Sequence, residues 1–241
     1  MMSYFGRFNY NYMSKYLLEM NLRYDGSSKF RPEDRWDFFY GFSGGWRLSE
    51  EEFMKNVKFV NELKLRLSYG VVGNQSGISR YDGMQLYNFN SVNGAYIGDG
   101  RISYIKTSGE IATMGRSWER IHNYNLGLDF HLFDSRLQGT VELFMKKNNN
   151  MLIAVAYPGI LGDKAPASNS GKFEAKGYEG TVTWSDKIGK VNYHVGGTFT
   201  YADNKLVDYG GVTVFKSGFV DKQQGYSCLL YASPSPRDRT R

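Results

Sequence analysis

The chain has 241 residues, and its 19 tyrosines, 16 phenylalanines and 28 glycines against only 5 prolines suit long strands with one apolar face better than an ordinary soluble domain. Its net charge of +6 comes from interspersed lysines, arginines and acids with no basic stripe, which argues against nucleic-acid binding. The single cysteine, Cys228, excludes an internal disulfide and a cysteine-based metal site.

Apolar and polar residues alternate with period two in about eight segments, which predicts strands with two different faces. In chain order the apolar faces lie within residues 4–12, 16–24, 38–48, 63–71, 122–132, 137–145, 178–184 and 191–201. No Asp, Glu, Lys or Arg occupies these faces, whereas the opposite faces carry residues such as Glu19, Arg23 and Arg66. Lipid contact explains this exclusion, because a charge at mid-bilayer on a barrel costs roughly 2–4 kcal/mol.

Aromatic residues lie near the ends of these faces, as in the interfacial girdles of membrane barrels. Examples are Tyr12, Tyr16, Tyr24, Trp46, Tyr69, Trp184 and Tyr201. The alternative is a β-sandwich core, which prefers Val, Ile and Leu because a buried tyrosine hydroxyl needs a partner. The mean hydropathy of −0.49 does not decide between them, since alternating strands average near neutral. We therefore expect an all-β antiparallel meander of transmembrane strands.

The links between strands alternate in length, as in bacterial barrels with short periplasmic turns and long external loops. Short turns are expected at 14–15, 134–135 and 186–190, and long links at 26–35, 73–117, 147–176 and from 203 onward. By parity, the segment 49–61 lies on the periplasmic side. Its start, Ser49-Glu50-Glu51-Glu52, predicts a helical turn with an N-cap.

Three motifs stand out: 22–30 (LRYDGSSKF), 42–51 (FSGGWRLSEE) and 63–70 (LKLRLSYG) followed by Gly73-Asn74-Gln75. Together with weaker similarity at 118–119, 125–130 and 176–180, they resemble the SusC/RagA family of TonB-dependent outer-membrane transporters. Tyr40 stands where the family often has proline, and 110–117 replaces its usual Asn-Pro-Asp-Leu stretch before Trp-Glu. These departures bear on the loops and on ligand recognition more than on the fold.

The resemblance implies that the strands form an open, curved part of a 22-stranded barrel in the outer membrane. It also implies a plug domain and a TonB-contacting segment upstream, energy from the TonB complex, and a SusD-like surface lipoprotein as partner. The expected substrate is an oligosaccharide or a peptide. Because Met1-Met2 runs directly into strand-like sequence, with no signal peptide, we expect an exported protein to lack its beginning here.

The last residues break the strand pattern. Residues 228–238 (CLLYASPSPRD) resemble the translation of a sequencing-library transposon adapter, the alternative being a native linker rich in proline, serine and arginine. We therefore assign residues 1–226 to a partial TonB-dependent receptor barrel and 227–241 to a non-native tail.

No catalytic or metal-binding constellation stands out, so we expect no enzyme and no cofactor. His122, His131 and His194 lie on different predicted strands without metal-ligand spacing. Carboxylates expected on the lumen face, such as Glu142, suit a water-filled wall as well as they suit a glycosidase pair. The glycine-rich run 94–100 lacks the strand-before, helix-after context of a phosphate loop. An enzymatic barrel would need a serine, a histidine and an acid aligned at a rim.

Substrate contacts are expected in the long link 73–117, because a rigid barrel holds its loops for recognition. Aromatic, amide and guanidinium side chains there suit sugar binding, although each could equally be an ordinary loop residue. The candidates are Asn74, Gln75, Tyr81, Tyr87, Tyr96, Arg101 and Tyr104. The alternative function is a surface receptor or adhesin that transports nothing.

Overall fold

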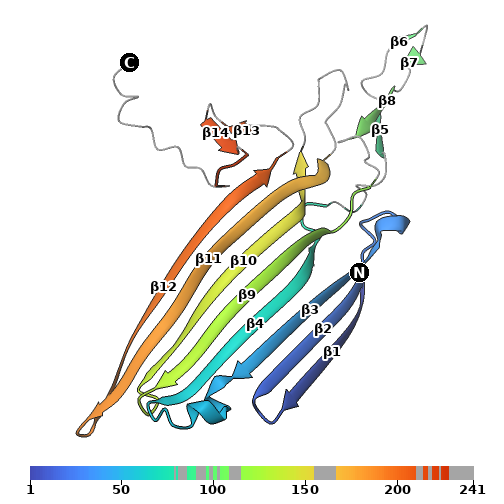
Figure 1. Ribbon diagram of the computed structural model, residues 1–241. Coiled ribbons are helices and arrows are strands. Elements are labelled where there is room, and N and C mark those ends of the chain that lie inside the picture. The colour runs from blue at the N-terminus through green and yellow to red at the C-terminus, as the bar shows by residue number, and fades with distance from the viewer. Residues whose placement is uncertain are drawn as a thin grey trace, which may run out of the picture.

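The main sheet of the computed structural model has eight antiparallel strands (Figure 1), in the order β1-β2-β3-β4-β9-β10-β11-β12. The strands are β1 (Met2–Tyr12), β2 (Tyr16–Gly26), β3 (Trp36–Arg47), β4 (Val60–Asn74), β9 (Glu119–Leu132), β10 (Leu137–Ala154), β11 (Ala167–Ile188) and β12 (Val191–Asp208). Each overlaps one of the alternating segments, so the predicted meander is confirmed.

Smaller elements lie in the links. They are the 3-10 turns η1 (Pro32–Asp34), η2 (Leu48–Glu50) and η3 (Glu52–Met54), and the two-stranded pairs β5 (Leu86–Asn90) with β8 (Tyr104–Ser108), β6 (Tyr96–Ile97) with β7 (Gly100–Arg101), and β13 (Val214–Lys216) with β14 (Phe219–Lys222). The structure describes residues 1–78, 80, 86–90, 96–97, 100–101, 104–108, 115–154, 167–209, 214–216, 219–222 and 224–227. Over these ranges, no helix is long and apolar enough to cross a membrane.

The strand register brings every apolar face to the same side of the sheet. One row of paired residues crosses all eight strands on that side: Tyr10, Leu18, Gly44, Leu67, Leu126, Leu143, Tyr178 and Tyr201. The adjacent row on the other side reads Asn9, Glu19, Ser43, Ser68, Asn125, Phe144, Gly177 and Ala202. The stretches 16–24 and 137–145, whose apolar faces carry no charge, match the about 9–11 residues that a tilted strand needs to cross a bilayer.

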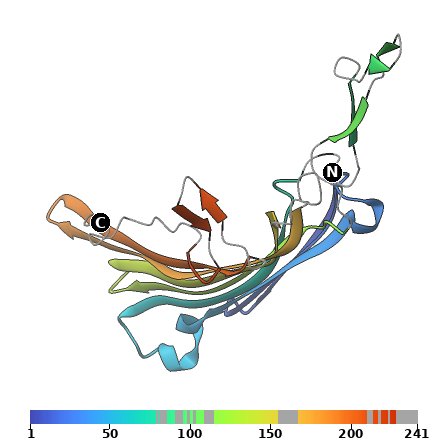
Figure 2. The same ribbon diagram turned by 90° about the horizontal axis from the view of Figure 1, so that it is seen from above.

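The sheet is curved and open, as expected for part of a larger barrel. Figure 2 shows its curvature from above, with β1 and β12 at the two free edges. Beyond β12 the chain returns to that edge, where the Leu206 amide donates to the Tyr226 carbonyl at 2.9 Å and the Gly225 amide donates to the Leu206 carbonyl at 2.7 Å. These bonds attach residues 225–226 to the edge strand β12.

Three strands continue past the apolar stretches toward the loop end, which the alternation pattern did not predict. β10 runs to Ala154, β11 begins at Ala167 and β12 runs to Asp208. The expected long link 147–176 is therefore mostly strand. Charged residues occupy the outer phase of these extensions, where Lys147 and Glu174 are paired across β10 and β11 with 3.6 Å between their charged atoms. Water wets both faces there, so the apolar signal disappears.

The opposite end carries the tight turns. Met13 and Ser14 have φ values of 53° and 56°, and the Lys15 amide donates to the Tyr12 carbonyl at 3.0 Å. Phe133, Asp134 and Ser135 likewise have positive φ, in the region that normally favours glycine. The third turn is shorter than predicted, because β11 and β12 pair down to Ile188 and Val191.

The linker between β3 and β4 corrects one prediction. Instead of one turn capped by Ser49, it forms the consecutive 3-10 turns η2 and η3, whose N-cap residues make no side-chain capping bond. The acidic Glu51 between them accepts from the Trp46 indole at 3.1 Å, the Tyr16 hydroxyl at 2.8 Å and the Lys15 ammonium at 3.3 Å. These donors lower the pKa of Glu51, the Trp46 bond most, and fasten the linker to the sheet end.

Aromatic rings cover several glycines across neighbouring strands. Phe199 lies over Gly180, Phe130 over Gly139 and Trp36 over Gly26, so that a Cβ at any of these glycines would collide with the ring. Each ring is directly opposite its glycine in the register. Such cross-strand pairing shields the backbone and fixes the register. By contrast, Cβ atoms at Gly6, Gly44 and Gly197 would enter open space.

Candidate functional site

The polar side of the sheet carries a network of ion pairs. The Arg66 guanidinium on β4 lies 2.8 Å from the Asp129 carboxylate on β9 and 3.5 Å from the Glu142 carboxylate on β10. Near the free edge, Arg7 pairs with Glu19 at 2.7 Å. A hollow of about 490 Å³ lies between these groups, with Glu19, Arg66 and Glu142 among its lining residues. This is a charged face opposite a charge-free one.

The histidines are dispersed on this sheet. His122 Nδ1 lies 2.9 Å from the Tyr69 hydroxyl oxygen, His131 lies 3.7 Å from the Glu62 carboxylate, and His194 on β12 is opposite Ser185 on β11. Across the described residues, no three His, Cys, Asp or Glu side chains gather in a way that would hold a metal ion.

A small apolar core closes the polar side near the loop end. Phe30, Phe39, Val71, Ile78 and Trp118 are all buried and pack together, with Trp118 only 3% exposed. The Phe30 and Trp118 ring centroids are 5.0 Å apart, and those of Phe39 and Trp118 are 5.5 Å apart. The Trp118 indole also donates to the Arg35 carbonyl at 3.3 Å. The link between β2 and β3 is thereby folded onto the sheet.

Glu119, at the start of β9, is the polar hub beside this core. It is 7% exposed and accepts from the Asn74 amide at 2.8 Å, the Asn148 amide at 3.3 Å and the Leu152 backbone N–H at 2.6 Å. These bonds join β4, β9 and β10 at the level where the long link 75–118 leaves and rejoins the sheet. Each buried partner left unpaired would cost roughly 1–3 kcal/mol, so the hub holds both ends of the link.

Two further contacts reinforce the ends of the links. The Ser27 hydroxyl donates to the Gln75 side-chain oxygen at 2.6 Å, which joins the link after β2 to the end of β4. Asn169 on β11 donates to the Ser117 carbonyl at 3.0 Å and to the Asn150 carbonyl at 3.1 Å. The loop end is therefore a preorganised rim.

A second hollow, of about 370 Å³, opens at this rim. Its lining includes Arg23, Asp25, Asn74, Gln75 and Trp118. Arg23 is paired with the buried Asp25 at 2.7 Å, yet its side chain is 54% exposed. The hollow thus combines a guanidinium, amides and an aromatic wall, the groups that hold sugars and peptide backbones.

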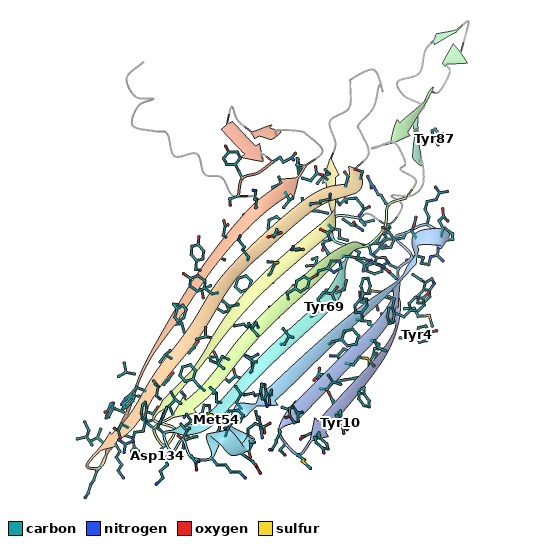
Figure 3. The ribbon with its side chains drawn as sticks, viewed as in Figure 1. Tyr4, Tyr10, Met54, Tyr69, Tyr87 and Asp134 are labelled. Carbon is teal, nitrogen blue, oxygen red and sulfur yellow. The ribbon has the colours of Figure 1, made fainter. Side chains whose placement is uncertain are left out.

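The structure brings together only some of the predicted contact residues. Asn74 and Gln75 lie at the hollow, although each also makes a structural bond, to Glu119 and Ser27 respectively. Tyr87, 65% exposed, lies on β5, in the hairpin that projects from the loop end (Figure 3).

The structure does not describe the side chains of the remaining candidates. Tyr96, Arg101 and Tyr104 belong to β6, β7 and β8, of which only the backbone is described, and Tyr81 lies outside the described residues. Sequence reasoning missed Arg23, Asp25 and Trp118 as residues of one hollow. The available signal was that all three fall within the motif segments 22–30 and 118–119.

Fold and site together define part of the wall of a membrane β-barrel, with a charge-free face on one side and ion pairs on the other. Residues 2–226 match the family described as TonB dependent receptor-like, beta-barrel, and the chain belongs to that family of outer-membrane receptors and transporters.

Named relatives agree with this assignment. TonB-dependent receptor P39 of Formosa agariphila is 31% identical over 93% of this chain and 21% of its own length. TonB-dependent receptor SusC of Bacteroides thetaiotaomicron is 34% identical over 76% of this chain and 18% of its own length. The structure of the RagAB peptide transporter matches with a TM-score of 0.79 and 27% identity over 93% of this chain and 24% of that chain. The chain therefore spans about a fifth of the length of these relatives.

Proposed function

We propose that the full-length protein is an active importer in the bacterial outer membrane, which takes up glycans or other oligomeric nutrients such as peptides. The observation that carries this proposal is the two-sided sheet: a charge-free face of bilayer height backs onto an ion-paired face that contains hollows. A wall of this kind separates lipid from a hydrated passage. Family membership and the likeness to SusC and to the RagAB peptide transporter support import over simple adhesion.

Partners and energy follow from the same family. We propose that the full-length protein works with a SusD-like surface lipoprotein and is energised by the TonB complex through a region outside residues 1–226. The similarity to the RagAB peptide importer, whose structure is known in an 'open-open' and a 'closed-closed' state, supports a two-component machine. This chain would supply part of the wall and part of the external rim, with no catalytic role and no cofactor.

The rim hollow is the proposed place of first contact with the substrate. Arg23, Gln75, Tyr87 and other side chains of the link 73–117 would hold an oligomer by aromatic stacking and hydrogen bonds. The rigid hub around Glu119 would fix the base of this link. The tail 227–241 has no part in the proposal, and we propose that it is non-native.

Uptake by cells tests the proposal. A strain lacking the full-length gene should lose growth on one class of oligosaccharide or peptide and regain it with the gene restored, but not in a background without TonB. Arg23→Ala should weaken uptake, whereas the neighbouring exposed Ser76→Ala, outside the hollow, should not. A strain that binds the oligomer at its surface and imports none of it would support the receptor alternative instead.

A further inference from the structure

The lipid-facing side of the sheet contains a groove that transport does not explain. It has a volume of about 310 Å³ and lies over β1 to β4. Gly44 forms its floor, because a Cβ there would meet no atom within 4 Å. Leu18, Leu65 and Leu67 are aliphatic lining residues, and Leu67 is 63% exposed. A groove with an open glycine floor and leucine walls matches the cross-section and chemistry of a hydrocarbon chain.

Aromatic rings mark one end of this groove as the membrane interface. The rings of Tyr10, Tyr12, Tyr16 and Trp46 form a stacked series with successive centroids 6.5, 6.4 and 6.4 Å apart. Tyr10, Tyr16 and Trp46 also line the groove. Tyrosine and tryptophan concentrate at the level of lipid headgroups, so a chain lying in the groove would place its headgroup beyond these rings.

A charge pair lies at that end. Lys15 and Glu51 are joined at 3.3 Å, and Glu51 is connected directly to two groove residues through its bonds to Trp46 and Tyr16. The Lys15 ammonium has three N–H donors, of which this pair uses one, and a carboxylate has about four acceptor sites, of which three are used. Lys15 therefore has N–H donors left for an anion, and Glu51 has an acceptor site left for a cation.

We propose that this groove binds one zwitterionic phospholipid with an ethanolamine headgroup from the periplasmic leaflet. One acyl chain would lie over Gly44 between the leucines. The phosphate would accept a hydrogen bond from Lys15, and the primary ammonium would donate to Glu51. Complementary charges on both partners select this headgroup. A choline headgroup has no N–H to donate, and an anionic glycerol headgroup leaves Glu51 opposite no cation.

Photolabelling of the full-length protein tests the inference independently of transport. The protein is placed in phosphatidylcholine vesicles containing a phosphatidylethanolamine probe with a diazirine in one acyl chain, and labelled peptides are mapped by mass spectrometry. Label should concentrate on β2 to β4 and exceed that of the matching choline probe about tenfold, the effect of one charge-assisted hydrogen bond. Gly44→Leu should fill the floor and abolish the enrichment. Gly6→Leu, also at an open glycine on the same face, should leave it intact.

The headgroup contacts are tested outside the strands, which keeps the experiment decisive if Gly44→Leu fails to fold. Lys15→Gln and Glu51→Gln should each reduce the preference for ethanolamine over choline to near one while acyl-chain labelling of β2 to β4 persists. Label spread evenly over the strands, equal labelling of Gly44→Leu and Gly6→Leu, or preference for an anionic phosphatidylglycerol probe would each overturn the proposal.

Discussion

A lysine placed on either side of one strand should distinguish a membrane wall from a sheet packed against protein. Val141 is at the middle of the charge-free face of β10, between Leu128 of β9 and Gly180 of β11. Val141→Lys at this depth should destabilise the full-length barrel by roughly 2–4 kcal/mol. Since each 1.36 kcal/mol is tenfold, the folding equilibrium should shift by about thirty-fold to almost a thousand-fold.

The adjacent Thr140 supplies the matched control. It is exposed on the polar side, opposite Asp129, so Thr140→Lys should change stability by less than about 1 kcal/mol. The assay is denaturant-dependent folding of the full-length protein into phospholipid vesicles, with the folded fraction read from heat-sensitive migration in gels. Equal losses in the two variants, or a greater loss for Thr140→Lys, would refute the assignment of the faces.

The remaining predictions concern the rings, the hub and the linker. Gly180→Ala should displace a covering phenylalanine and cost about 1–3 kcal/mol in the same folding assay, whereas Gly197→Ala, in open space, should be nearly neutral; equal effects would contradict ring shielding. Glu119→Gln should raise the rate of proteolysis within the link 73–117 by about tenfold, because a charged acceptor of three hydrogen bonds is lost, and an unchanged rate would remove its role as hub. The pKa of Glu51 lies below its ordinary 4.5, so its contacts should be intact above that pH and weaken as pH falls through the lowered pKa. The fluorine resonance of fluorotryptophan-labelled Trp46 should shift in that acidic range in wild type and not in Glu51→Gln.

The sequence predicts the membrane part of the fold well because two solvents impose opposite demands on alternate residues. Leu126 and Asn125 are adjacent in the chain, yet one must face lipid and the other water, and the registers confirm this separation. Where water reaches both sides the constraint disappears, which is why the extensions of β10 and β12 were not foreseen. The N-cap predicted at Ser49 is not formed, because Glu51 is held by hydrogen bonds to the end of the sheet rather than by a helix.

The site was harder to predict because it depends on contacts distant in sequence. Gln75 was expected in a loop with recognition residues, but its bond to Ser27 and its place beside Arg23 follow from the β2-β3-β4 order. From the sequence, Trp118 and Glu119 are part of a family motif, but their structural roles cannot be predicted. Only the three-dimensional arrangement shows that one anchors the link after β2 and the other ties three strands together.

The two ends of the sheet differ in how much change they tolerate. At the tight turns, as at Met13 and Ser14, one inserted residue that entered the following strand would exchange its two faces, because side chains alternate with a period of two. At the other end, the link between Asn74 and Glu119 begins and ends beyond the bilayer stretch, so its length changes without altering the phase of any strand. If this link recognises the substrate as proposed, genetic variation can accumulate in it and reshape what is recognised, while the wall keeps its alternation.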